Sequence, residues 1–383
     1  MGPLHGLRVI EMAGIGPIPF AGMMLADFGA DVIRVDRLAL PTLAEVVGAD
    51  PTGRGRRSIA LDLKKPEANE IALQLVDTAD IFIEGFRPGV MERLGLGPEV
   101  CLRRRPSLVY GRMTGWGQDG PRAKTAGHDI NYLSLTGVLA AIGTKEHSLP
   151  PLNLIGDYGG GAMLLLVGVL AGALAARGGG GGQVVDAAMV DGVSLLASLV
   201  HGQLVNGGWV EARQSNLLDG GAPFYRTYRT SDGEEMAVGA LEPQFYADLL
   251  AGLGLTEADL PSQHDRDGWP ELTRRFAASF GAQPRTHWVE VFTRTDACVS
   301  PVLSWSEAVD DPHLRARSVM ISENGMLQAA PAPRFSATPL DPIRPLVNAG
   351  DDTKVILASL GYDEDAIVKL IADKVAGAPK ARN

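Results

Sequence analysis

Short apolar runs alternate with amphipathic segments over the first part of the chain. Strands are expected where β-branched and apolar residues cluster, at residues 7–12, 30–36, 58–63, 81–84 and 108–113. Helices are expected between them, notably at residues 20–28 and 66–79. Because strands that alternate with helices form parallel sheets, the first 150 residues predict an open α/β sheet domain.

The pattern changes at about residue 195. From there to about 300, helices mix with short strands such as residues 235–239, which predicts a second, smaller α+β domain. Beyond about residue 310 the chain is dotted with prolines and ends in a helical segment at 353–360, so it is expected to pack back on the first domain. The expected domains are a large domain at 1–190, completed by 310–383, and a small domain with its linkers at 191–309.

Residues 159–176 form an uncharged apolar stretch about as long as a minimal membrane span. The stretch carries five glycines and starts beside Asp157. We therefore expect a buried helix that packs closely on its neighbours, and no membrane span. The first eight residues lack a basic segment followed by an apolar one, so no secretory signal is expected.

The composition of the chain disfavours several classes of function. The 383 residues are 45% hydrophobic and 21% charged, as in a globular protein with an ample core. The net charge of −10 disfavours nucleic-acid binding. Cys101 and Cys298 are far apart and lack metal-ligand spacing, so neither a disulfide framework nor a zinc site is expected, and a cytoplasmic location fits.

The glycine-rich turn at residues 14–19 follows the first expected strand, as in dinucleotide-binding domains. Asp36 would suit a ribose hydroxyl. However, Pro17 lies inside the turn and Pro19 occupies the position of the third glycine, which is wrong for a pyrophosphate. Neither NAD nor FAD is therefore expected.

His128 and Asp157 are the first candidates for chemistry. His128 lies in a polar, turn-like segment, and a histidine that titrates near neutral pH can act as base in one direction and acid in the other. Asp157 opens the apolar stretch, so it could be a simple helix N-cap. The same helix end could stabilise an enolate oxygen. Two such groups on opposite sides of a carbon could move a proton from one face to the other, which is racemase chemistry.

Glu242 follows a strand-like segment and precedes Pro243. It could be an exposed turn residue, or it could bond a nitrogen of His128 and raise its basicity. Basic residues gather at the expected strand ends and loops: Arg37, Arg54, Arg56, Arg57, Lys64, Lys65 and Arg87. In an acidic protein such a collection suggests a phosphate-bearing ligand, bound at the carboxyl ends of the strands.

Long motifs then point to one family. They include Gly85-Phe86-Arg87-Pro88-Gly89-Val90, Gly127-His128-Asp129-Ile130-Asn131-Tyr132 and Asn153-Leu154-Ile155-Gly156-Asp157, with further matches at 7–11, 26–36, 112–118, 185–192, 219–225, 242–246 and 296–302. On these segments, within residues 4–340, the chain resembles the α-methylacyl-CoA racemases of the family III CoA-transferase superfamily.

The resemblance implies a Rossmann-like sheet domain with the small domain inserted between its halves, in an interlocked homodimer. The active site would lie between the large domain of one chain and the small domain of the other. No metal or redox cofactor is implied, because coenzyme A is carried by the substrate.

The resemblance also assigns residues. His128 with Glu242 would act on the S face of the substrate carbon and Asp157 on the R face, with Asp129 and Asn153 in support. The residues implied to contact the CoA nucleotide are Arg37, Leu61, Lys64 and Arg87.

The expected activity is that of an isomerase, a 2-methylacyl-CoA racemase that works through an enolate. The main alternative is a family III CoA-transferase, in which Asp157 attacks a thioester to form an acyl anhydride. A transferase needs no second base, so His128 with Glu242 favours the racemase. A non-catalytic acyl-CoA binding protein would leave all three residues without a role. The acyl group stays open among methyl-branched fatty acyl, bile-acid and arylpropionyl chains.

Overall fold

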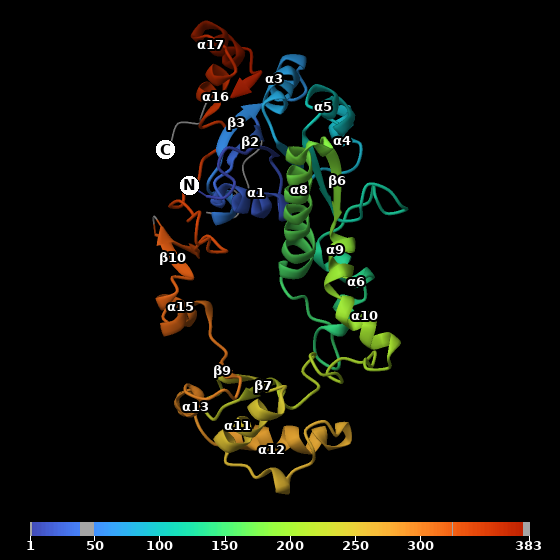
Figure 1. Ribbon diagram of the computed structural model, residues 1–383, viewed down its shortest axis with the longest axis vertical. Coiled ribbons are helices and arrows are strands. Elements are labelled where there is room, and N and C mark those ends of the chain that lie inside the picture. Colours follow the sequence, from blue (N-terminus) through green and yellow to red (C-terminus); the bar gives the residue numbers. More distant parts are fainter. Residues whose placement is uncertain (1, 39–49, 324, 378–383) are drawn as a thin grey trace. The chain divides into compact units, whose positions relative to one another are not determined.

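The computed structural model describes residues 2–38, 50–323 and 325–377. The chain forms two compact units, and the colours of Figure 1 follow the sequence through them from blue to red. Unit 1 comprises Met1–Thr136, Leu152–Ala197 and Met320–Asn383, and unit 2 comprises Gly137–Pro151 and Ser198–Val319. The chain therefore enters unit 2 twice, once for a short excursion and once for a long insertion.

Seven strands form the sheet of unit 1, in the order β12-β3-β2-β1-β4-β5-β6. Their bounds are β1 Arg8–Met12, β2 Asp31–Arg37, β3 Arg57–Leu61, β4 Ile81–Glu84, β5 Val109–Thr114, β6 Gln183–Ala188 and β12 Ala376–Gly377. Neighbouring strands run parallel except β12, which is antiparallel to β3. The predicted parallel sheet is confirmed, and its antiparallel edge comes from the end of the described chain.

Helices cover both faces of this sheet because alternate strand residues point to opposite sides. On one face Ile10, Phe82 and Tyr110 pack with helices α3, α16 and α17; on the other, Val9 and Ile83 pack with α1 and α8. The unit 1 helices are α1 Pro17–Asp27, α3 Pro66–Asp77, α4 Val90–Arg93, α5 Pro98–Arg104, α6 Asp129–Leu135, α8 Leu164–Ala175, α9 Met189–Leu196, α16 Thr353–Ser359 and α17 Glu364–Ala372, with a short 3-10 turn at Pro51–Gly53.

The apolar stretch forms a helix of three segments. The π-helical segment η2 (Leu154–Met163) leads into α8, and η3 (Ala176–Gly180), which is kinked at Gly179, follows α8. By length and composition alone, Leu154–Gly180 could cross a membrane, and 44% of its most apolar window is buried. A Cβ at Gly111 of β5 would lie 2.7 Å from Val169, so this glycine lets α8 approach the sheet closely. The close packing is as predicted, but the opposite side of the helix is exposed at Val167 and Leu174.

The C-terminal segment packs on unit 1. Ile356 and Leu357 of α16 are fully buried in the core. The Asp352 carboxylate accepts a 2.8 Å hydrogen bond from the backbone N–H of Ser58. A two-stranded antiparallel pair, β10 (Met320–Glu323) with β11 (Met326–Ala329), precedes this segment.

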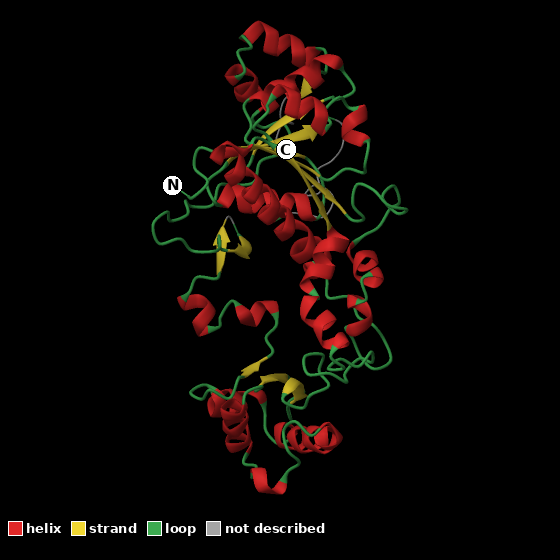
Figure 2. Cartoon of the chain, turned by 45° about the vertical axis from the view of Figure 1, so that its right-hand side comes forward, coloured by secondary structure: helices red, strands yellow, loops and turns green. Residues whose placement is uncertain are grey.

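Unit 2 is built on a three-stranded antiparallel sheet with helices packed against it, which confirms its predicted α+β character (Figure 2). Aromatic side chains such as Phe224, Phe276 and Trp288 fill its core. Its elements are α7 Val138–Ala141, α10 Ser198–Val205, β7 Tyr225–Arg229, β8 Glu235–Gly239, α11 Pro243–Leu253, α12 Trp269–Gly281, α13 Arg285–Phe292, β9 Val299–Pro301, α14 Trp305–Ala308 and α15 Pro312–Ala316, with 3-10 turns at Glu257–Asp259 and Arg266–Gly268.

Candidate active site

The strand order of unit 1 reverses at β1. The chain goes from β1 through β2 to β3 on one side, and then from β4 through β5 to β6 on the other. In open α/β sheets, ligands bind outside the carboxyl ends of the strands at such a reversal. The loops that follow β1 and β4 flank this point and are the expected place for a ligand site.

Asp157 lies in the first turn of η2, which begins at Leu154. The expectation that Asp157 itself opens the helix is therefore wrong, because Asn153 occupies the N-cap position. The Asn153 side-chain amide donates to the Asp157 carboxylate over 3.4 Å. A Cβ at Gly16 would lie 3.2 Å from Asp157 Oδ2, so the loop after β1 runs directly beside this carboxylate.

Asp129 joins the two predicted catalytic segments. Its buried carboxylate accepts a 2.8 Å hydrogen bond from the backbone N–H of Asp157. A Cβ at Gly156 would come within 2.5 Å of Asp129 Oδ2, so only glycine allows this approach. His128, the exposed N-cap residue of α6, directly precedes Asp129. The structure thus brings His128, Asp129, Asn153 and Asp157 into one cluster.

The pKa of the Asp157 carboxyl is raised, chiefly because the group is partly buried. The nearby charge of Asp129 also raises this pKa, whereas the hydrogen bond from Asn153 and the charge of His128 lower it. A carboxylate of raised pKa is a stronger base than an ordinary aspartate. The surroundings of Asp157 therefore favour proton transfer.

Tyr132 belongs to the same cluster, although sequence reasoning assigned it no role. Its ring packs edge-on against Trp116, with centroids 4.8 Å apart. Burial raises the pKa of Tyr132 to about 12; the Asp157 charge adds to the rise, and Arg87 opposes it. Tyr132 therefore lies within electrostatic reach of both Asp157 and Arg87. Its spacing of one helical turn from His128 was the available signal.

The residues predicted to bind the nucleotide lie along the carboxyl edge of the sheet. Arg37 ends β2 and is the register partner of Leu61, which ends β3. The Arg37 guanidinium lies 5.4 Å from the centre of the Phe86 ring, in the loop after β4. Arg87 is the next residue, and Lys64 lies in the loop after β3; Arg37, Lys64 and Arg87 are all exposed. These cations are available to a ligand.

The other predicted cations are not available in the same way. Three arginines before and within β3 form internal ion pairs: Arg54 with Asp27 at 2.6 Å, Arg56 with Glu11 at 3.0 Å, and Arg57 with Asp31 at 2.6 Å. Lys65 donates to the backbone carbonyl of Asp373. The expectation that all the basic residues at the strand ends and loops mark a phosphate ligand is therefore wrong for these four. Carboxylates or a backbone carbonyl of the protein already pair with their side chains.

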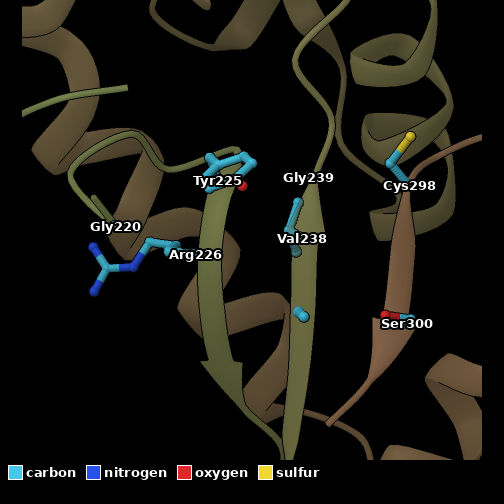
Figure 3. A pocket seen from close by; sticks show the side chains of 8 residues that line it. Gly220, Tyr225, Arg226, Val238, Gly239, Cys298 and Ser300 are labelled. Atoms are coloured by element: carbon cyan, nitrogen blue, oxygen red, sulfur yellow. The ribbon is translucent and has the colours of Figure 1, made fainter. Parts of the chain in front are cut away.

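Glu242 belongs to unit 2, where it is the exposed N-cap residue of α11. A cavity of about 440 Å³ opens on the three-stranded sheet of this unit, lined by Tyr225, Arg226, Val238, Gly239, Cys298 and Ser300 (Figure 3). The pKa of the Cys298 thiol is raised by burial and by the charge of Glu242. Glu242 therefore lies close to the cavity wall. Its pairing with His128 stays a prediction.

Among residues 2–38, 50–323 and 325–377, no three His, Cys, Asp or Glu side chains form a group that could hold a metal ion.

A profile of the family described as CoA-transferase family III matches residues 4–353, most of the chain. The protein belongs to CoA-transferase family III. Within this family, the chain is 44% identical over 382 residues to the mouse protein named alpha-methylacyl-CoA racemase, with 99% of each chain covered. It is 43% identical over 384 residues to the human protein of the same name, again with 99% of each covered.

Solved structures of family III proteins share the fold. The crystal structure of Rv3272 from M. tuberculosis matches with a TM-score of 0.79 at 26% identity, covering 93% of this chain and 99% of that one. A CAIB/BAIF family protein from Brucella suis matches with a TM-score of 0.78 at 24% identity, covering 94% and 99%. The predicted family III fold is thereby confirmed.

Proposed function

We propose that this protein is an isomerase that interconverts (R)- and (S)-2-methylacyl-CoA thioesters by moving the α-proton from one face to the other. The observation that carries the proposal is the pair of acid/base groups, His128 and Asp157, held in one cluster through Asp129. The near full-length similarity to two proteins named alpha-methylacyl-CoA racemase supports it.

The chemistry follows from the acidity of the substrate. A thioester makes its α-carbon acidic because the carbanion delocalises as an enolate. Asp157 or His128 removes the α-proton, and the group on the opposite face, in its protonated form, returns a proton to the carbon. We assign His128 to the S face and Asp157 to the R face. The raised pKa of Asp157 suits this work because its protonated form donates, and its ionised form accepts, closer to neutral pH.

We further propose that the CoA nucleotide lies along the carboxyl edge of the sheet. Arg37, Lys64 and Arg87 would pair with its phosphates, and the nucleotide would pass the end of β3 at Leu61, whose own side chain is buried in the core. The exposed state of the three cations supports this assignment. The protein needs no metal or redox cofactor for this reaction, since the thioester itself supplies the activation.

The runner-up is transfer of CoA between acids, with Asp157 as nucleophile. We favour racemisation because the cluster offers a second acid/base residue, which a transferase does not need. The two proposals predict different products from the same incubation.

The deciding experiment uses purified protein with (R)-2-methylacyl-CoA in deuterated water. Deuterium gain at the α-carbon and drift toward an equal mixture of epimers support the racemase. CoA transfer to an added free carboxylic acid, without α-exchange, would overturn it. His128→Ala also separates a racemase, which loses inversion and exchange of the S epimer, from a simple acyl-CoA binder, which keeps its affinity.

We propose a homodimer in which Glu242 of one chain supports His128 of the other. Exposed apolar side chains support an interface. In unit 1 they include Val167 and Leu174 of α8 and Leu196 of α9, and in unit 2 Leu199 and Val205 of α10. Such residues are usually covered in a soluble assembly. Sedimentation should give twice the monomer mass, and Val167→Glu should shift the protein toward monomer; an unchanged monomer in the wild type would contradict the proposal.

The free state of Cys101 and Cys298 supports a reducing compartment, and we propose the cytoplasm.

A further inference from the structure

Three charged residues form a group beside the loop that follows β4. Glu84 ends β4, and Arg112 is its register partner in β5. Arg112 Nε donates to Glu84 Oε1 over 3.0 Å, and Arg112 Nη1 lies 2.9 Å from Oε1 of Glu92 in α4. The Glu84 side chain is fully buried and that of Arg112 is 8% exposed, whereas Glu92 is 45% exposed.

The two carboxylates stand at opposite ends of one loop, residues 85–89. Glu84 immediately precedes the loop, and its second oxygen accepts a 2.7 Å hydrogen bond from the backbone N–H of Phe86. Gly89, with a φ of 82°, turns the chain into α4, which carries Glu92. Because both carboxylates bind the same guanidinium, Arg112 ties the start of the loop to the helix at its end.

The loop carries two side chains that face the carboxyl edge. The Phe86 ring lies under the Arg37 guanidinium, 5.4 Å from it. Arg87 is exposed and lies within electrostatic reach of Tyr132 in the catalytic cluster. The loop thus spans the distance between the proposed nucleotide site and the proposed acid/base site.

We propose that Arg112 is a positioning residue which, through Glu84 and Glu92, holds loop 85–89 in the conformation that binds coenzyme A. The inference deepens the proposed function and rests on it for the identity of the ligand. Ordering a loop before binding removes part of the entropy cost of binding, so the effect should appear in affinity.

The burial of Glu84 supports this role. Burial raises the pKa of Glu84 to about 7, although Arg112 and the Phe86 N–H both lower it. An apolar pair of similar size would hold two strands together without the cost of burying charge. The charged group instead supplies what an apolar pair lacks: an acceptor for the loop backbone and a guanidinium that reaches Glu92.

The test uses Glu92→Gln in the full-length protein, because Glu92 is half exposed and its loss leaves the buried Glu84–Arg112 pair intact. Calorimetric titration with free coenzyme A should give a dissociation constant about five- to tenfold higher than the wild type. KM for the acyl-CoA should rise in parallel, with kcat and the melting temperature little changed. If Glu92 only stabilised the fold, Glu92→Gln would lower the melting temperature and would not raise KM relative to kcat.

The matched control is Glu99→Gln in α5, which removes an exposed carboxylate paired with Arg103 at 2.8 Å. This variant should bind coenzyme A like the wild type. If Glu92→Gln also binds like the wild type, the positioning role is wrong.

A double-mutant comparison tests whether Glu92 acts through the loop. Arg87→Ala removes the loop cation that we assign to the nucleotide. Adding Glu92→Gln to the Arg87→Ala variant should raise the dissociation constant by a smaller factor than Glu92→Gln does in the wild type. The reason is that the Arg87 side chain, which the loop positions, is already absent. Fully additive effects would overturn the inference.

The inference and the proposed function fail in distinguishable ways. A wild type that binds coenzyme A but exchanges no α-proton ends the racemase proposal and leaves the loop inference supported if Glu92→Gln weakens binding. A wild type that exchanges α-protons while Glu92→Gln binds normally ends only the loop inference. A wild type that does not bind coenzyme A at all contradicts both.

Discussion

The backbone N–H of Asp157 donates a 2.8 Å hydrogen bond to the carboxylate of Asp129. Asp129 directly follows His128, so a single bond couples the positions of the two proposed acid/base residues. The substrate α-carbon must fit between the two bases, so a small displacement of either base should lower the reaction rate strongly.

Replacement of Asp129 should expose this coupling. Asp129→Ala removes the acceptor and should lower kcat by about a hundredfold with a smaller change in KM. Asp129→Asn keeps an acceptor oxygen but removes the charge that raises the pKa of Asp157, so it should retain more activity and shift the acid limb of the pH–rate profile to lower pH. Equal losses in the two variants would contradict the coupling.

Gly156→Ala tests the same contact by crowding. The new Cβ would meet Asp129 Oδ2 at 2.5 Å, so the carboxylate must move. We expect kcat to fall while the far-ultraviolet circular dichroism of the protein stays unchanged. The control is Gly178→Ala, where an added Cβ meets nothing within 4 Å. Full activity in Gly156→Ala would show that Asp129 is not a fixed support.

Removing one base at a time should split the reaction into halves. Asp157→Asn leaves His128, which can still exchange the α-proton of the S epimer with solvent but cannot complete inversion. His128→Asn should show the mirror behaviour with the R epimer. Nuclear magnetic resonance of each epimer in deuterated water measures both. Exchange of the opposite epimer by each variant would mean that the faces are wrongly assigned, and exchange of both epimers by either variant would contradict the two-base mechanism.

Glu84 should make stability depend on pH. Its pKa rises from 4.5 to about 7 on folding, so the protonated form is favoured in the folded state. Its contribution is therefore fully present below about pH 4.5 and is lost as pH rises through about 7, by up to about 3 kcal/mol. Glu84→Gln cannot titrate, so urea unfolding at a series of pH values should show a flatter decline between those limits. An unchanged slope would contradict the shift.

Gly22 of α1 lies against the buried Glu11–Arg56 ion pair. A Cβ there would meet Glu11 Oε2 at 1.9 Å and Arg56 Nη2 at 2.8 Å. Because displacement leaves charges buried without their partners, Gly22→Ala should lower the free energy of unfolding by about 3–5 kcal/mol. Urea denaturation measures this, again with Gly178→Ala as control. A loss below about 1 kcal/mol would mean that the pair can move freely.

The sequence predicted the parts of the fold that depend on local pattern. The strands that end at Arg37 and Glu84 were found from their apolar runs, and the rule that parallel strands align their carboxyl ends brought Arg37 and Arg87 to one edge. Leu61 was implied only by the family resemblance, and it ends β3 at the same edge. The start of the apolar helix was missed, because it begins at Leu154, three residues before Asp157, in a π-helical segment, which is a rare form.

Contacts between distant segments could not be predicted. Arg56 is buried because it pairs with Glu11 of β1, 45 residues away in the sequence. The Asp129–Asp157 hydrogen bond depends on a close approach that only glycine at position 156 permits. The Glu84–Arg112 pair requires the register of β4 against β5. In each case the local sequence shows a charge, but its partner is known only once the sheet is assembled.

The antiparallel edge strand β12 has a consequence for biosynthesis. Ala376 of β12 pairs with Leu61 of β3, and Ser58 of β3 is hydrogen-bonded to Asp352, 294 residues further along the chain. Nearly all of the polypeptide must therefore leave the ribosome before the edge of the large sheet can close. The core residues of unit 2 lie between Ala222 and Ala297 and leave the ribosome before β12, so the inserted domain can fold before the sheet of unit 1 gains its last strand.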